Sequence, residues 1–323
     1  MKIYPNKLSL LITLCCVLGN SQIFAQKNAK APDWQLAVQT YSFRLFTFAE
    51  ALKKADSIGI KYVQAFPGQK IGVGIEGTMD YHMSASKRDS VLALAKKKGI
   101  TIVSYGVVTA RSESDWRAIF DFAKGMGLKQ FASEPEPEFI PLVSKLADEY
   151  KINVAFHDHP RPSRYWHPDT LIKYTAGYSI RLGSCADIGH WVRSGLDPVE
   201  MLKKLRGRVL ELHMKDLHEK PSEEYAAFLL SRPPAGTGNQ NRQPGSGAQP
   251  ASQPQQKRPQ MPAGPHDVIW GTGVSNVKGV LKELKAQNFK GPIIAEYEYD
   301  WNNNAPAIAE SFRYVKDVIN KMK

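Results

Sequence analysis

Short apolar runs alternate along this chain with longer stretches in which apolar residues recur every three or four positions. Runs of this kind are typical of buried strands, and the longer spacing predicts amphipathic helices. Glycine or asparagine stands just before several of the runs, where a helix is expected to stop. Eight strands are predicted: Leu36–Thr40, Tyr62–Ala65, Thr101–Tyr105, Gln130–Ser133, Asn153–His157, Ile180–Ala186, Val209–His213 and Pro292–Glu296.

This alternation of strands and helices predicts a parallel sheet that is covered by helices and buried on both faces. Eight β/α units within residues 35–323 fit a (β/α)8 TIM barrel, an α/β fold made of a single domain. A doubly wound open sheet is the alternative. The first strand is not followed by a glycine-rich phosphate-binding turn, which disfavours that alternative.

Residues 231–265 break the alternation, because proline, glycine, glutamine, serine and arginine dominate them. Such a segment buries too little apolar area to order itself, so we expect a disordered loop insertion. It follows the seventh strand and therefore borders the rim where the strands end. A tolerated surface insertion is the simpler interpretation; a flap or a contact to a partner is the alternative.

The first residues have the features of a secretory signal peptide. Lys2 and Lys7 precede the apolar stretch Leu8–Leu18, and Ala25 offers a small residue for cleavage. We therefore expect a signal peptide over residues 1–25, a linker over 26–34, and export to the periplasm. The apolar stretch is too short to span a bilayer, so no membrane span is expected in the mature chain. The large Leu14 before Cys15 makes a lipoprotein the less favoured alternative.

Composition narrows the remaining classes. Cleavage would leave Cys185 as the single cysteine, so no internal disulfide forms and stability depends on the core. The formal net charge is +12, which suggests lysine-rich helix faces. Basic runs interleaved with aromatic residues are lacking in the sequence, so we expect no nucleic-acid partner. The sequence does not indicate an oligomeric state.

Four predicted strands end in a side chain that can bind a metal: His157, Asp187, His213 and Glu296. In a β/α barrel the carboxyl ends of all strands meet at one rim, where active sites are built. Imidazole nitrogens and carboxylate oxygens together suit a divalent ion. The sequence therefore predicts one bound divalent metal, Mn, Co, Zn or Mg.

Further rim residues are candidates for catalysis: Glu134, His159, His190 and Lys215. His159 lies on the same strand face as the first ligand, and Lys215 on the same face as the third. His190 follows Asp187 by three positions. Simpler roles remain open: Asp187 as a helix N-cap, Lys215 in a solvated ion pair, and Glu134 as a solvated loop acid.

The ligand set itself leaves alternatives. Glu298 shares a face with Glu296, and either can be the ligand from the eighth strand. Glu134 can serve as a fifth ligand. Asp216 can orient a histidine, as carboxylates beside metal ligands do. The aromatic residues after Glu296 suit stacking against a sugar ring.

With these residues in hand, the chain resembles the xylose isomerase-like TIM-barrel superfamily, over roughly residues 35–320. This superfamily includes sugar phosphate isomerases/epimerases and the AP endonuclease family 2 nucleases. The resemblance implies a metal held from the fifth to eighth strands, where His157 replaces the usual Glu. A second Glu that epimerases often hold beyond that ligand has no counterpart in residues 160–167. The resemblance rests on Phe-His157-Asp-His159-Pro, Asp187-Ile-Gly-His190, Leu-His213-Met-Lys-Asp216, Trp270-Gly-Thr-Gly and Ile-Ala-Glu296-Tyr.

The resemblance implies a metal-dependent isomerase or epimerase that works through an enediolate on a small-molecule sugar or keto-sugar. A 3-keto-glycoside lyase or hydrolase with the same metal site is the second expectation, because the same intermediate can eliminate a leaving group. A non-catalytic carbohydrate-binding barrel is the third. A nuclease is disfavoured, since the first two strand ends offer no histidine for a three-zinc centre.

Overall fold

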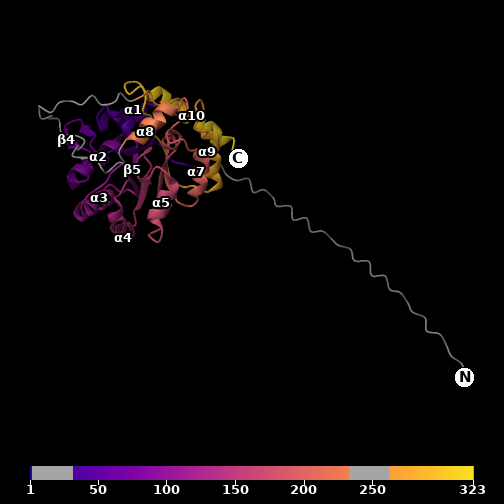
Figure 1. The fold of residues 1–323 in the computed structure, drawn as a ribbon. Helices are drawn as coiled ribbons and strands as arrows, with labels where there is room; N and C mark the ends of the chain where they lie inside the picture. The colour runs from indigo at the N-terminus through magenta and orange to yellow at the C-terminus, as the bar shows by residue number, and fades with distance from the viewer. Residues whose placement is uncertain (2–31, 233–261, 323) are drawn as a thin grey trace.

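The computed structural model describes residues 32–232 and 262–322, together with Met1. The predicted signal peptide and most of the predicted insertion at 231–265 lie outside these residues. Eight parallel strands form a nearly closed barrel with helices outside it (Figure 1), which confirms the predicted fold. The barrel strands are β1 (Leu36–Gln39), β2 (Tyr62–Ala65), β5 (Thr101–Tyr105), β6 (Gln130–Ser133), β7 (Asn153–His157), β8 (Leu182–Asp187), β9 (Val209–Met214) and β10 (Ile293–Ala295).

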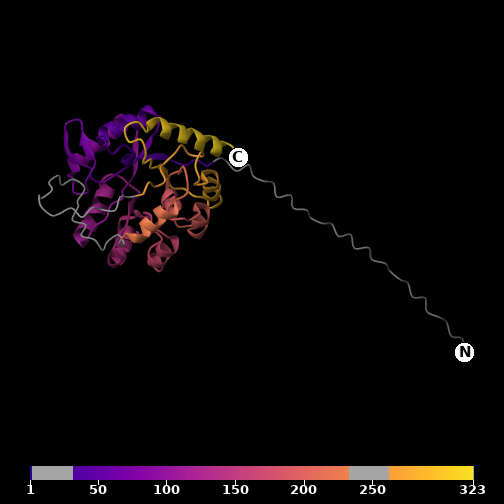
Figure 2. The same ribbon diagram turned by 45° about the horizontal axis from the view of Figure 1, so that its top comes forward.

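The strands lie in the order β5-β2-β1-β10-β9-β8-β7-β6, and an isolated parallel bridge between Val108 and Ser133 links the two ends of this sheet. Helices follow one another around the sheet in Figure 1, and the C-terminal helix α10 lies beside the N-terminal elements in Figures 1 and 2. The helices are α1 (Phe48–Ser57), α2 (Ala85–Lys97), α3 (Glu113–Gly125), α4 (Ile140–Tyr150), α5 (Pro168–Thr175), α6 (Ile188–Arg193), α7 (Pro198–Lys204), α8 (Glu223–Ser231), α9 (Val277–Ala286) and α10 (Ala305–Asn320). Short 3-10 turns add η1 (Thr40–Phe43) and η2 (Pro137–Phe139).

Local sequence explains where the helices begin. The Thr47 hydroxyl accepts the backbone N–H of Glu50, and the Glu50 carboxylate accepts the backbone N–H of Thr47 at 2.8 Å, which makes a reciprocal cap for α1. Ser84, Ser112 and Asp197 cap α2, α3 and α7 in the simpler way. None of the helices in the described residues is long and apolar enough to cross a membrane.

The structure departs from the predicted elements in a few places. The sixth strand begins at Leu182 rather than Ile180, because the Leu182 N–H closes a turn on the Ser179 carbonyl. An antiparallel hairpin, β3 (Lys70–Gly72) with β4 (Ile75–Thr78), follows β2 and was not predicted. Its strands are too short and polar to give a strand pattern.

The predicted linker also ends differently. Trp34 is buried, and its indole N–H donates to the Phe289 carbonyl at 3.0 Å. The packed domain therefore begins at least one residue before the predicted boundary at residue 35.

Asp216 holds the loop around Trp270-Gly271-Thr272-Gly273 against the barrel. Its carboxylate accepts the backbone N–H groups of Gly271, Gly273 and Ser275 at 2.7, 3.0 and 2.9 Å. A Cβ on Gly273 would lie 2.5 Å from this carboxylate, which explains the glycine. The hypothesis that Asp216 orients a histidine is therefore wrong: its oxygens are used by this loop.

Replacing Asp216 by Ala should destabilise the fold, because it leaves these N–H groups without their charged acceptor. We expect the free energy of unfolding to fall by about 3 kcal/mol. Urea denaturation measures this, with Asp317→Ala as the control, since that exposed residue forms a surface ion pair with Lys321. Equal stability of the two variants would contradict this role for Asp216.

Candidate metal centre and active site

The four predicted metal ligands lie together at the carboxyl ends of adjacent strands. His157 ends β7, Asp187 ends β8, His213 lies near the end of β9, and Glu296 directly follows β10. Asp187 pairs in register with His213, which sets these two side chains next to each other. One ligand atom from each of the four lies within 4.8 Å of the others, and all four residues are buried.

Each histidine of this group uses one ring nitrogen in a contact with a carboxylate. His157 Nδ1 lies 3.3 Å from Glu134 Oε1, and His213 Nδ1 lies 2.8 Å from Glu296 Oε2. Within the described residues, the Nε2 atoms of both histidines are buried without a hydrogen-bond partner, and Oδ2 of Asp187 faces the Lys215 ammonium at 3.1 Å. Buried unpaired polar atoms are costly, and an imidazole held at Nδ1 by a carboxylate presents Nε2 to a metal. The residues therefore fit a divalent ion.

Asp187 has the N-cap role that the sequence offered as one alternative, and its position leaves the predicted ligand role open. Its Oδ1 accepts the backbone N–H of His190 at 2.9 Å, so it is the N-cap of α6. Its Oδ2 faces the ligand cluster, 3.7 Å from His157 Nε2. The backbone N–H of Asp187 donates to Asp158 at 2.7 Å, which fixes the strand end. Because the cap uses Oδ1, the other oxygen points to the centre of the cluster, where Lys215 Nζ lies 3.1 Å from it.

Lys215 is fully buried among carboxylates. Its Nζ lies 3.1 Å from Asp187, 3.2 Å from Glu296 and 2.9 Å from Glu298. Burial alone would lower the pKa of Lys215, but these carboxylates raise it well above its usual range. The alternative of a solvated ion pair is therefore wrong, since the lysine is a buried ammonium at the centre of the site.

Glu134 and His159 form a second pair beside the ligands. His159 Nδ1 contacts Glu134 Oε1, and the same oxygen contacts His157. Burial would raise the pKa of Glu134, but the two imidazoles hold it well below its usual range. The His159 side chain is 50% exposed. Glu134 is thus a held carboxylate rather than a solvated loop acid, and His159 is open to a substrate.

The structure adds a buried arginine and aspartate that the sequence did not reveal. Arg193 lies 3.3 Å from both Glu298 and His190 Nδ1, and 3.4 Å from Asp267. Burial lowers the pKa of His190, and Lys215 and Arg193 lower it further. The sequence offered one signal for Arg193: it follows His190 by three positions on a helix, so the two side chains lie on the same helix face. Asp267 borders the low-complexity segment and gave none.

This network also bears on the open choice between two carboxylates. Glu298 contacts Lys215 and Arg193, and it does not belong to the group of four ligand atoms, whereas Glu296 does. Glu134 lies within reach of His157 in a separate group with His159. The structure thus brings all eight predicted residues together, and their individual roles remain predictions.

Asp267 should make stability depend on pH. Burial raises the pKa of Asp267 to about 7, although Arg193 and Lys215 oppose this. The unfolded chain loses this proton near the usual pKa of 3.8, so the contribution is complete below that pH. As the pH rises towards about 7, the free energy of unfolding should fall by about 1.4 kcal/mol per unit from this group.

The Asp267→Asn variant should flatten this slope. Urea denaturation of chelator-treated protein across the same pH range measures it, with the exposed Asp317→Asn as the matched control. An unchanged slope in Asp267→Asn would contradict the assignment.

Comparisons with known proteins agree with this architecture. Residues 52–318 match the family model described as "Xylose isomerase-like TIM barrel". The curated inosose dehydratase of Clostridium beijerinckii is 25% identical over 178 residues, which are 53% of this chain; the chain spans only 47% of that relative's length. The crystal structure of an uncharacterized protein from Parabacteroides distasonis is 28% identical, with a TM-score of 0.63, and covers 88% of this chain and 99% of that one.

A more distant structure is that of the IOLI protein with a bound zinc atom. It is 14% identical, with a TM-score of 0.57 over 89% of this chain and 98% of that one, so it supports the fold alone. Members of the matched family are mostly enzymes that process carbohydrates. Because the family model covers most of the sequence, this chain belongs to the xylose isomerase-like TIM barrel family.

Proposed function

We propose that this chain is a divalent-metal-dependent enzyme that removes a proton beside the carbonyl of a sugar or keto-sugar, and that it acts as an isomerase or epimerase. One observation carries the proposal: the ligand atoms of His157, Asp187, His213 and Glu296 lie within 4.8 Å of one another, beside a half-exposed histidine. Metal and base at one rim are what such chemistry requires.

The roles follow from the contacts. His157, Asp187, His213 and Glu296 would hold the ion. A bound divalent ion would supply Lewis acidity to a carbonyl and its adjacent hydroxyl, which would acidify the C–H of the carbon that bears this hydroxyl. His159 is the proposed base, because its ring is half exposed.

Two charged side chains support this base and its product. Glu134 holds the His159 ring in place through Nδ1. Lys215 places a fixed positive charge among the ligands, where it would stabilise the enediolate oxygen as negative charge develops. We thus assign proton removal to the His159 imidazole and stabilisation of the developing negative charge to the Lys215 ammonium.

The fate of the enediolate separates two candidate reactions. Return of the proton to carbon gives isomerisation or epimerisation. Loss of a group from the neighbouring carbon gives elimination, as expected of a 3-keto-glycoside lyase. The curated relative that is named a dehydratase supports this second candidate. Export, predicted from residues 1–25, would favour unphosphorylated substrates for either reaction.

A non-catalytic sugar-binding barrel is the remaining alternative. Such a protein needs aromatic contacts but no buried cluster of His157, Asp187, His213 and Glu296 around an ammonium. The cost of burying these charges makes this alternative the less favoured one.

Metal analysis of the purified protein tests the centre. We expect about one divalent ion per chain, because the described residues contain one group of four ligand atoms. His157→Ala and Glu296→Ala should each lose the ion, while the exposed His82→Ala should keep it. A parent protein that stays metal-free after reconstitution with Mn, Co or Zn would contradict the centre.

Proton abstraction is tested by exchange in deuterated water. Ketoses and 3-keto-glucosides, incubated with metal-loaded protein, should take up deuterium beside the carbonyl. His159→Ala should slow this exchange by roughly 100-fold or more, whereas His82→Ala should not. A product of unchanged mass apart from deuterium indicates isomerisation, and loss of the leaving group indicates elimination. Absence of exchange in every substrate would overturn the proposal.

A further inference from the structure

We propose that Cys185 is a direct ligand of the bound metal, together with His157 and His213, and that this sulfur biases the centre towards Zn²⁺ or Co²⁺ over Mg²⁺ or Mn²⁺. Asp187 and Glu296, the rim carboxylates of the proposed function, would remain the oxygen ligands of the same ion. The inference rests on the metal centre of the proposed function and names a ligand that this function does not require.

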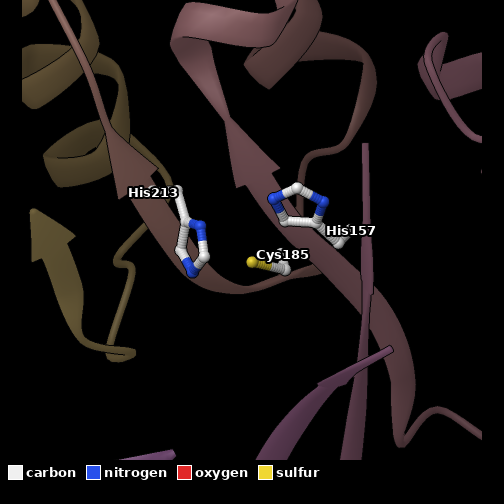
Figure 3. A group of neighbouring side chains, drawn as sticks. All are labelled: His157, Cys185 and His213. Carbon is white, nitrogen blue, oxygen red and sulfur yellow. The ribbon is translucent and has the colours of Figure 1, made fainter. Parts of the chain in front are cut away.

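Strand geometry places the sulfur beside the two imidazoles. Cys185 lies two residues before Asp187 on β8, so both side chains point into the barrel. In the register of β7 and β8, Cys185 is the direct partner of His157. Figure 3 shows its sulfur between the rings of His157 and His213, and one donor atom from each of the three lies within 4.8 Å of the others.

The donors that surround this point are buried and unpaired. The exposed fractions of His157, Cys185 and His213 are 1%, 0% and 0%. Within the described residues, Nε2 of each histidine has no hydrogen-bond partner. Two imidazole nitrogens left without partners would cost free energy in this interior unless a cation or a donor joined them. An ion between the two rings and the sulfur satisfies both nitrogens at once.

The other neighbours of the sulfur leave this role to Cys185. Ala132 and Ala155 pack with it as small apolar side chains and offer no donor. The nearby Glu211 is already used below, where its two oxygens accept the amides of Gln64 and Gln130 at 2.9 and 2.6 Å. Glu211 is the direct partner of Cys185 in the register of β8 and β9, so the thiol lies beside this carboxylate as well as beside the two histidines.

The chemistry of this donor set decides which ion it prefers. Two imidazoles with a thiolate suit zinc and cobalt, whereas magnesium and manganese prefer oxygen ligands. A coordinating thiol gives up its proton to solvent when the ion binds. No oxidant or reductant takes part, so the step balances as one S–H bond broken and one metal–sulfur bond formed.

Cobalt spectroscopy tests the ligand directly. The full chain carrying Cys15→Ser and Cys16→Ser keeps Cys185 as its only thiol. Titration of this metal-free protein with CoCl₂ should produce visible cobalt bands and a near-ultraviolet sulfur-to-cobalt charge-transfer band. Cys185→Ser in the same background should keep visible bands and lose the charge-transfer band. Its preference for Zn²⁺ over Mn²⁺ should fall roughly tenfold or more.

Three outcomes decide the matter. Cobalt binding without a charge-transfer band in the parent would overturn the ligand role of Cys185 and leave the metal centre of the proposed function standing. Absence of cobalt binding would overturn the inference, and it would overturn the metal centre as well when Mn and Zn also fail to bind. A charge-transfer band in the parent that is lost in Cys185→Ser supports the inference. Cys185→Ala, which matches the neighbouring alanines in size, must lose the band as well. Circular dichroism must show that both variants are folded.

Discussion

Burial of opposite charges at one barrel rim is the interaction on which the rest of the site depends. An ammonium or carboxylate can be taken out of water only when partners replace the lost solvation. Lys215 meets this condition through Asp187, Glu296 and Glu298, which lie 2.9 to 3.2 Å from its nitrogen. Parallel strands that end side by side supply such partners from several chain segments at once.

The same constraint explains the groups around the centre. Arg193 has two carboxylate partners, the buried Asp267 and the partly exposed Glu298, and is itself buried. His157 and His213 each have a carboxylate on one ring nitrogen, and the other nitrogen has no partner in the part of the chain that the structure describes. A divalent ion would bind the open imidazole nitrogens and balance the buried carboxylates. The proposed function therefore includes a metal.

The sequence predicted the barrel and its candidate ligands because both depend on local signals. Strands such as Thr101–Tyr105 and Asn153–His157 have the predicted bounds, since they are apolar runs between clear helix stops. His157 and Asp187 were identified because a donor at the end of an apolar strand is visible in sequence. Contacts between distant segments could not be identified in this way. Asp267 contacts Arg193 across 74 positions, and the three N–H groups that donate to Asp216 come from a loop more than 50 residues away. The β3–β4 hairpin was missed because its strands are short and polar.

Membership of the family determines the barrel fold, whereas the reaction depends on particular side chains at its rim. The curated relative is named a dehydratase, the family model is described by xylose isomerase, and one barrel can serve both because metal and base act before the two reactions diverge. In this chain, the proposed donor set has His157 where the resemblance implies a Glu, and it includes Cys185 beside this histidine. Differences of this kind, rather than the barrel, would decide the ion and the substrate.

Anomalous diffraction from crystals of the metal-loaded protein tests the central claim most directly. Data collected on both sides of the absorption edge of the bound ion locate it without reference to activity. The account predicts one strong anomalous peak per chain, between His157, Asp187, His213 and Glu296. A peak elsewhere on the barrel, or none at that position in protein that contains the ion, would contradict it.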